Sequence, residues 1–372
     1  MKRFLRIVLF LVFAGGFIFQ GSAFAQNNLE NAFKKVKKGY QTVRYHAVAI
    51  DTTAAPRGMK RPDFRGGEDR YRIQRWEVWY EGPDKVRLER LNKRSSRKII
   101  LIRKGSQLYI KFGERWVVRP ILKEEKSMFL GLPWHLRGAP YLKLIQKNYK
   151  IDFKPDGEII GRRVALLSIQ PKYKARMIWK LWIDASTGII LRQLQQVETP
   201  FGLKILKARQ MTFIEYGGNF PDSLFSVSGR IVKQKREFRR RRRIHFNTEG
   251  ETFKSLRDLA DRAPCSIFAP EPSLNGFAFV RGKLLKRPRM TMIQTHYSDG
   301  LIDFSIFQID ARKNVRKRFM KRFMERRPRG RRRPLMEIYP LEKNGFAFLI
   351  LSHFPGPWVR EAAVRLKPLP ED

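Results

Sequence analysis

Hydrophobic residues recur at every second position through much of the first two thirds of the chain. The alternation is clearest at residues 43–49, 76–80, 86–88 and 108–112, and the turns between the later segments are short and contain Gly, Pro or Asp. A period of two is typical of a β-strand with one buried face. Turns of two to four residues are too short for a parallel crossover, so consecutive strands must run antiparallel. The pattern therefore predicts an antiparallel meander that ends near residue 118.

Other patterns interrupt and then extend this meander. Residues 29–36 have helical spacing after Asn28, which predicts a short amphipathic helix that ends at Gly39. Residues 123–149 are bulky, apolar and broken by prolines, which predicts short helices and a loop across the sheet. Five further strands are predicted at residues 149–153, 163–170, 177–184, 189–197 and 203–216.

A second, smaller unit follows a basic linker. Its strands are predicted at residues 276–280, 290–297, 301–309, 335–339 and 346–352, and its last helix at 359–366. The expected organisation is an export segment at 1–25, a first domain at 26–230, an Arg-rich linker at 231–246, and a second domain at 247–372 with a basic insertion at 312–333.

The first 25 residues predict export. Three basic residues precede an apolar run, and Ala23-Phe24-Ala25 forms a small-x-small cleavage site. A membrane anchor is the alternative, because the uncharged stretch 7–25 is almost long enough to span a bilayer. Its glycines, its polar residues and the cleavage site favour a signal peptide, and no other long apolar run follows. We therefore expect a soluble periplasmic protein, exported through a cleaved signal peptide.

The net charge of the chain is extreme. There are 78 Lys and Arg against 34 Asp and Glu, for a net charge of +44, and loss of the three basic residues of the signal peptide leaves +41. Such a charge suggests nucleic acid as the partner, but an exported protein does not meet chromosomal DNA or ribosomes, so we expect no nucleic acid. Residues 233–243 and 312–333 carry +7 and +12 of the excess. The remainder is spread over the chain.

Arginine pairs bidentately with phosphate and carboxylate groups, so the two arginine runs are candidate anion sites that could contact an anionic membrane peripherally. The alternative is solvated charge without specificity. The candidate anion-binding residues are Arg239, Arg240, Arg241, Arg242, Arg243, Arg331, Arg332 and Arg333.

Bulky apolar residues in the first domain are candidates for the lining and lid of an apolar ligand cavity. The alternative for each of them is an ordinary place in the core, which periodic apolar residues usually occupy. The candidates are Trp76, Val78, Tyr80, Leu108, Ile110, Trp116, Met128, Phe129 and Trp134.

The sequence offers little support for catalysis. Its five histidines show no metal-ligand spacing, and no nucleophile elbow, phosphate-binding loop or dinucleotide fingerprint is present. The single cysteine, Cys265, excludes an intramolecular disulfide framework and is expected to be a small buried residue. Asp184 is expected to form a hairpin turn. We expect no enzymatic activity, no cofactor and no metal.

Two series of residues resemble a known family. The first is G-R-x-V, P-K, L-W-I-D-x-x-T-G and L-R, in that order, within residues 161–192. The second is HYSDGLI at 296–302, followed by FSIF at 304–307. Together they resemble the MucB/RseB family, whose N-terminal domain shares the fold of the lipoprotein carrier LolA. The linker and the insertion depart from that family's pattern.

The resemblance implies an α+β fold in which a curved antiparallel sheet, a half-barrel, wraps around helices and a smaller α+β domain follows. It implies a regulator that binds the periplasmic segment of a membrane anti-sigma factor, with a lipid, lipopolysaccharide or lipoprotein acyl chain as the signal of envelope stress. Two alternatives remain open from the residues. One is a lipid or lipoprotein carrier of the LolA type, and the other is an envelope protein that binds polyanions through its arginine runs.

Overall fold

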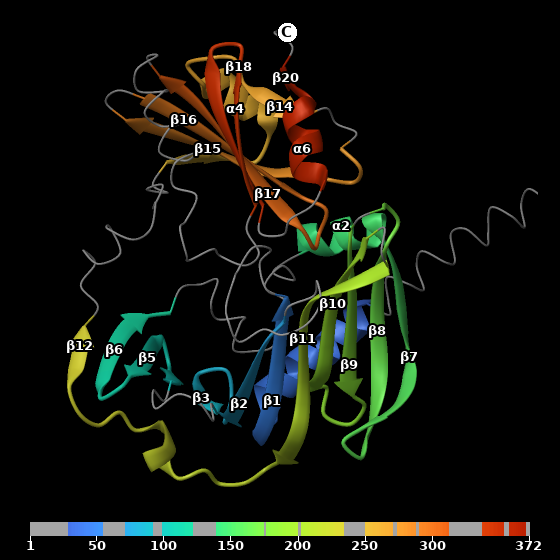
Figure 1. Cartoon of the computed structure of the whole chain (residues 1–372), viewed down its shortest axis with the longest axis vertical. Helices are drawn as coiled ribbons and strands as arrows, with labels where there is room; N and C mark the ends of the chain where they lie inside the picture. Colours follow the sequence, from blue (N-terminus) through green and yellow to red (C-terminus); the bar gives the residue numbers. More distant parts are fainter. Residues whose placement is uncertain are drawn as a thin grey trace, which may run out of the picture.

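A computed structural model of the chain shows two units (Figure 1). The structure describes residues 29–54, 71–91, 99–121, 139–174, 176–199, 202–233, 250–270, 274–287, 290–311, 337–352 and 357–369. The first unit is built on a 12-stranded sheet, and the second on a 6-stranded sheet beside a separate pair of short strands. The predicted α+β class, with a large curved sheet and a smaller second domain, is confirmed.

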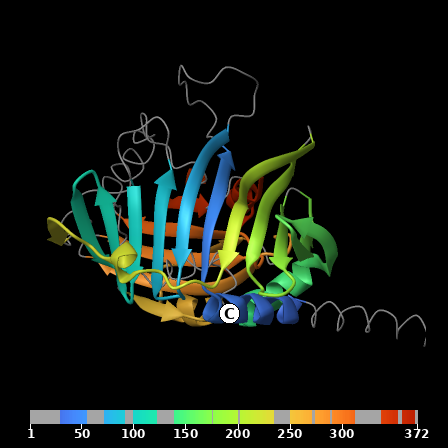
Figure 2. The ribbon, with the colours of Figure 1, turned by 90° about the horizontal axis from the view of Figure 1, so that it is seen from below.

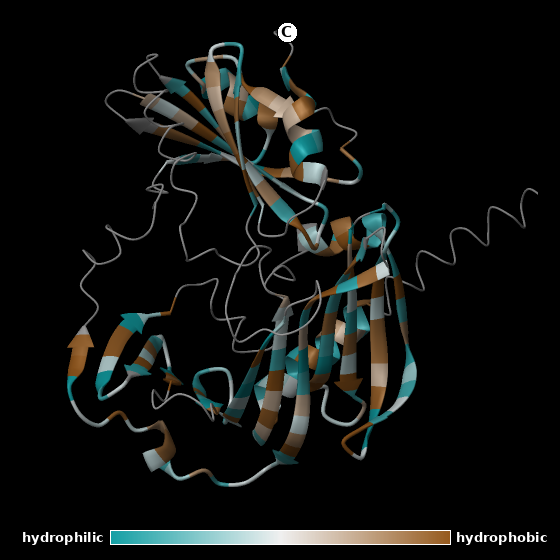
Figure 3. Ribbon diagram, in the orientation of Figure 1, coloured by the Kyte–Doolittle hydropathy of each residue, from teal (hydrophilic) through white to brown (hydrophobic). Residues whose placement is uncertain are grey.

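The 12-stranded sheet joins two meanders. Its order is β12-β6-β5-β4-β3-β2-β1-β11-β10-β9-β8-β7, so β1 to β6 and β7 to β11 are each laid down in sequence, and the two halves meet where β1 pairs with β11. Apolar and polar residues alternate along many of these strands (Figure 3). The strands are β1 (Tyr45–Ala54), β2 (Tyr71–Tyr80), β3 (Lys85–Leu91), β4 (Ile99–Lys104), β5 (Gln107–Phe112), β6 (Arg115–Pro120), β7 (Tyr149–Ile159), β8 (Arg162–Pro171), β9 (Met177–Asp184), β10 (Ile190–Thr199), β11 (Gly202–Tyr216) and β12 (Ile231–Lys233).

A helix at residues 29–42 lies along one face of this sheet. Leu29, Ala32, Val36 and Tyr40 are buried, at the spacing of a single apolar helix stripe. Figure 2 shows the strands fanning out in an open arc above the helix. Burial of this stripe against the sheet forms the main core of the first unit.

Gly39 lies inside this helix, although the sequence predicts that the helix ends there. A Cβ atom at Gly39 would overlap the carbonyl oxygen of Thr187, and one at Gly188 would overlap the carbonyl oxygen of Lys35. Both glycines therefore serve the close approach of the helix to the loop between β9 and β10. The predicted helix end was wrong because a contact distant in sequence, not the local backbone, requires the glycine.

Residues 231–233, expected in the linker, form β12 at the edge of the first sheet. β12 pairs in parallel with β6, with Ile231 opposite Trp116. The short 3-10 helix η2 (Asp222–Phe225) precedes it on the path from β11. The connection from β6 to β12 spans more than 100 residues, which permits a parallel pair that the short turns elsewhere in the sheet exclude.

The second unit is a 6-stranded antiparallel sheet in the order β13-β15-β16-β17-β19-β18. Helix α4 (Leu256–Arg262) begins at Ser255, whose hydroxyl accepts a hydrogen bond from the Asp258 amide at 3.0 Å. The sheet strands are β13 (Glu251–Phe253), β15 (Ala278–Arg287), β16 (Met290–Ser298), β17 (Asp303–Ala311), β18 (Glu337–Lys343) and β19 (Phe346–Ser352).

The last helix, α6 (Pro357–Val364), ends earlier than the predicted range of 359–366. Leu366 instead begins β20 (Leu366–Pro368), which pairs with β14 (Phe268–Pro270). A strand of three residues is too short to show a period of two, so the sequence pattern extends the helix through it.

Candidate functional site

We call the face of the first sheet that packs against helix 29–42 the helix face. Its central residues are Tyr45, Val78 and Tyr80, which belong to the core cluster that contains the helix. Directly paired residues on neighbouring antiparallel strands lie on the same face. The register of the sheet therefore assigns every other strand residue to the helix face or to the opposite face.

Five aliphatic residues form a row across the helix face. Val78 pairs with Leu88, Leu88 with Leu101, Leu101 with Ile110, and Ile110 with Val117. Val78 is buried, and the other four side chains are only half-buried. We call this set the apolar row. An aliphatic surface of this kind that the described core does not fully cover is suited to contact an acyl chain.

Five of the predicted cavity residues lie on the helix face, and one does not. Strand alternation and pairing place Trp76, Val78, Tyr80, Leu108 and Ile110 there. Val78, Tyr80 and Leu108 are buried, so they belong to the ordinary core, whereas Trp76 and Ile110 are half-buried. The predicted set of cavity residues therefore contains both core residues and residues that could contact a ligand.

Trp116 lies on the opposite face of the sheet. It packs with Ile100, Ile102 and Phe225 in a separate apolar cluster, and its indole Nε1 donates a hydrogen bond to the carbonyl oxygen of Ser228 at 2.9 Å. The segment around η2 covers this cluster. Trp116 is therefore a structural residue under a surface segment, and it does not line the helix face.

The remaining predicted site residues lie outside the described residues. They are Met128, Phe129, Trp134, Arg239, Arg240, Arg241, Arg242, Arg243, Arg331, Arg332 and Arg333. Within the described ranges, no group of three His, Cys, Asp or Glu side chains could hold a metal ion. None of the helices in those ranges is both long enough and apolar enough to cross a bilayer.

A buried polar cluster joins the two units, and we call it the junction. It contains Asn148 at the end of helix α2 (Ala139–Asn148), Tyr149, Arg176 and, from the second unit, Asp299. The Asn148 Nδ2 donates to the carbonyl oxygens of Gly276, at 2.7 Å, and Asp299, at 2.9 Å. The Tyr149 hydroxyl donates to Asp299 Oδ2 at 2.8 Å, and Arg176 Nε lies 3.7 Å from the same oxygen.

Asp299 is the central residue of the junction. Its Oδ1 accepts hydrogen bonds from the amides of Leu301, at 2.9 Å, and Ile302, at 2.8 Å. Burial raises the pKa of Asp299, although Arg176 and the hydrogen bonds oppose this shift. The Arg176 guanidinium lies 4.2 Å from the ring centre of Phe277, which adds a cation–π contact. The junction is thus a buried ionic pair in which Asp299 is well hydrogen-bonded, whereas Arg176 Nε and Asn148 Oδ1 have no hydrogen-bond partner among the described residues.

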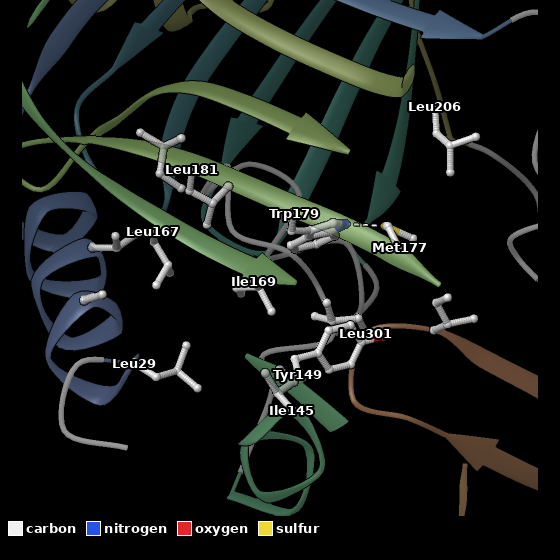
Figure 4. Packing of buried hydrophobic residues seen from close by; sticks show 14 of the residues in the cluster. Leu29, Ile145, Tyr149, Leu167, Ile169, Met177, Trp179, Leu181, Leu206 and Leu301 are labelled. Atoms are coloured by element: carbon white, nitrogen blue, oxygen red, sulfur yellow. Dashed lines mark hydrogen bonds between the residues drawn. The ribbon is translucent and has the colours of Figure 1, made fainter. Parts of the chain in front are cut away.

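Two glycines allow the units to approach closely. A Cβ at Gly300, where φ is +107°, would lie 2.6 Å from Ile145 Cγ1 and 2.7 Å from Ile145 N. A Cβ at Gly276, where φ is +86°, would lie 2.7 Å from Tyr173 Cε2. Figure 4 shows Ile145, Tyr149 and Leu301 packed together at this point. The turn that contains Gly300 connects β16 to β17, and no local sequence pattern indicates that it contacts the first unit.

Comparison with solved structures identifies the type of fold. A crystal structure of MucB in complex with MucA(peri) matches 92% of this chain and 99% of the matched chain, with a TM-score of 0.50 and 14% identity. The Pseudomonas aeruginosa MucA/MucB complex matches the same shares with a TM-score of 0.44 and 13% identity. A LolA superfamily protein from Nitrosomonas europaea matches 53% of this chain and 97% of its own, with a TM-score of 0.26 and 14% identity.

The chain therefore has the two-unit fold of MucB. This fold confirms the resemblance that the motifs at 161–192 and 296–307 indicate. No protein-family model matches the sequence, and no curated protein does so either.

Proposed function

We propose that this protein is a periplasmic regulator that binds the periplasmic segment of a membrane anti-sigma factor and responds to a lipid or lipopolysaccharide. The single observation behind the proposal is the match to MucB across both units, since that MucB structure was determined with MucA(peri) bound. The signal peptide predicted at residues 1–25 supports a periplasmic location, and the proposal assigns a binding role without catalysis.

The junction supports a role that needs both units. Separating a buried ionic pair is costly, because it leaves a buried charge without its partner. Asn148 and Tyr149 donate hydrogen bonds to Asp299 across the two units, and the Arg176 guanidinium lies beside its carboxylate. A partner segment that contacts both units would meet them in a fixed arrangement, which reduces the ordering cost of binding.

The apolar row supports the second part of the proposal. Leu88, Leu101, Ile110 and Val117 offer a half-buried aliphatic surface next to the core, as an acyl chain requires. The same surface favours a carrier of the LolA type as the second candidate. A carrier would transfer its acyl ligand to an acceptor, whereas a regulator would release its protein partner when the ligand binds.

Affinity capture from a membrane extract with the full mature chain tests the proposal. We expect one single-span membrane protein with a periplasmic segment, and we expect added lipopolysaccharide to release it. Leu101→Glu, in the apolar row, should abolish release but not capture. Lys111→Glu is the control, because Lys111 lies on the opposite face of the neighbouring strand. Recovery of lipoproteins or lipids without a single-span protein would contradict the regulator and favour the carrier.

A further inference from the structure

A band of basic side chains lies on the helix face beside the apolar row. Register places Arg72 of β2 next to Thr53, Arg209 of β11 opposite Asp51, and Lys207 of β11 opposite Thr53. Arg90 of β3 pairs with Trp76. We call Arg72, Arg90, Lys207 and Arg209 the cationic band. The amide side chains around it belong to Gln74, Gln193 and Gln195.

The band has far more positive than negative charge. Asp51 is the one carboxylate among the described cross-strand neighbours of these four cations. Arg209 already engages both oxygens of Asp51, with Nε donating to Oδ1 at 2.6 Å and Nη2 to Oδ2 at 2.9 Å. No carboxylate of the described residues pairs with Lys207, Arg90 or Arg72.

Arg72 and Arg90 share only a neutral acceptor. With its amide in the orientation that satisfies the hydrogen bonds, the Gln74 oxygen accepts from Arg72 Nη2 at 3.1 Å and from Arg90 Nη1 at 3.2 Å. A neutral amide does not balance two guanidinium charges. Three of the four cations are therefore left without a counter-charge among the described residues.

Arg72 is exposed, but burial of its neighbours in the band is unfavourable in an empty protein. Arg90 Nε and Trp76 Nε1 are buried, and neither has a hydrogen-bond partner among the described residues. Burial lowers the pKa of Lys207, and Arg209 lowers it further, while Asp51 opposes the shift. Unsatisfied buried donors and repelling cations both destabilise the folded state. A bound anion would satisfy these donors and offset the repulsion between the cations.

We infer that the cationic band is a binding site for a phosphate-type oxyanion. A phosphate monoester carries close to two negative charges and three acceptor oxygens, enough to neutralise two cations and accept from several donors at once. Lys207, Arg72 and Arg90 are the cations free to bind it, and Arg90 Nε and Trp76 Nε1 are donors without partners.

The position of the band specifies the ligand further. Arg90 and Leu88 lie two residues apart on β3, on the same face, so the band and the apolar row are about 7 Å apart. A phosphorylated amphiphile can therefore place its head group on the band and its acyl chain along Leu88, Leu101 and Ile110. This extension to an amphiphile rests on the proposed function. The oxyanion site itself does not.

The test uses titration calorimetry on the full mature chain with three probes: pyrophosphate, lysophosphatidic acid below its micelle concentration, and a monoacylglycerol with the same acyl chain. The variants are Lys207→Gln and Arg90→Gln. Arg75→Gln is the matched control, because Arg75 lies on β2 but is exposed on the opposite face.

We expect lysophosphatidic acid to bind more tightly than either pyrophosphate or the monoacylglycerol. Each band variant should weaken it at least about tenfold, as loss of a charge-assisted hydrogen bond does, and Arg75→Gln should leave it unchanged. Without ligand, Lys207→Gln should melt at the same temperature as wild type or above it, because it removes a desolvated, repelled cation. A residue with a purely structural role would lower the melting temperature.

Other outcomes are informative. Pyrophosphate binding that is lost in both band variants supports the site even if lysophosphatidic acid binds no more tightly, in which case a free oxyanion is the ligand. Equal effects of the three variants, or binding only of acidic peptides, would overturn the inference. Affinity capture with Lys207→Gln separates the oxyanion site from the proposed regulator function, because this variant lacks the oxyanion site. If it still captures the membrane partner, the regulator function does not depend on that site.

Discussion

Gly300→Ala perturbs the junction at its closest contact. Gly300 has a φ of +107°, and an added Cβ would lie 2.6 Å from Ile145 Cγ1 and 2.7 Å from Ile145 N. Gly202 is a matched control, because its φ is +102° and a Cβ there would meet no heavy atom within 4 Å. Both alanines carry similar backbone strain, so their difference isolates the contact between the units.

The difference in unfolding free energy between the two variants can be worked out for two structural responses, which we call routes. If the core shifts to admit the methyl group, overpacking costs about 1–3 kcal/mol. If the junction opens instead, the protein loses two hydrogen bonds from Asn148 and one from Tyr149, at about 1 kcal/mol each. The two routes together bracket an additional loss of about 1–3 kcal/mol for Gly300→Ala, or a further fall of about 2–12 °C in the melting temperature.

Thermal unfolding of wild type, Gly300→Ala and Gly202→Ala measures this difference, and small-angle X-ray scattering shows which route the protein takes. An increased radius of gyration for Gly300→Ala would indicate an opened junction, and an unchanged one a shifted core. Equal melting temperatures for the two variants would refute the view that the turn at 298–300 fixes one unit against the other.

Three further variants test other parts of the fold by unfolding experiments. Burial alone would raise the pKa of Asp184, but hydrogen bonds from Ser186, Thr187 and Tyr216 outweigh burial, and the pKa is lowered. The contribution of ionised Asp184 to folding stability is therefore complete above pH of about 4 and is lost as pH falls through the folded-state pKa. Asp184→Asn should cost about 1–3 kcal/mol at pH 7, and this loss should shrink in acid. Gly39→Ala should destabilise the first unit by about 1–3 kcal/mol through overlap with Thr187, despite alanine's better helix propensity, and a stabilised variant would contradict that contact. Trp116→Ala should cost about 3–5 kcal/mol without changing the affinity for acyl ligands, and a loss of ligand affinity would return Trp116 to the site.

Local patterns predicted the strands and their pairing well. The meander ending near residue 118 and the strands of the second half follow from period-two alternation and short turns, which encode antiparallel neighbours directly. The three-residue strands β12, β13, β14 and β20 were missed because they are too short for any period to show. Gly39 was misinterpreted as a helix end because the contact that requires a glycine there is with Thr187, which is distant in sequence.

The candidate site was predicted less well than the fold. Alternation placed Trp76 and Val78 on one face correctly, but it could not place Trp116 relative to them, since the face of each strand depends on register across several hairpins. The sequence could not predict that Asn148 and Arg176 belong to the junction. In a sequence, a polar residue that pairs across two units cannot be distinguished from a polar residue on the solvent-exposed surface. The motifs that carry the family resemblance include Asp184 and Asp299, each of which organises a buried turn.

The order of strands has a consequence for how the chain folds. The meanders β1 to β6 and β7 to β11 can each form from local contacts, but they are joined by the β1–β11 pair, in which Tyr45 lies opposite Tyr216. Closing a loop of about 170 residues costs about 4–5 kcal/mol of chain entropy before the pair forms. Such a high contact order slows folding. Until β11 arrives, β1 presents an unpaired edge, so the folding chain depends on rapid completion of this one pair to escape aggregation.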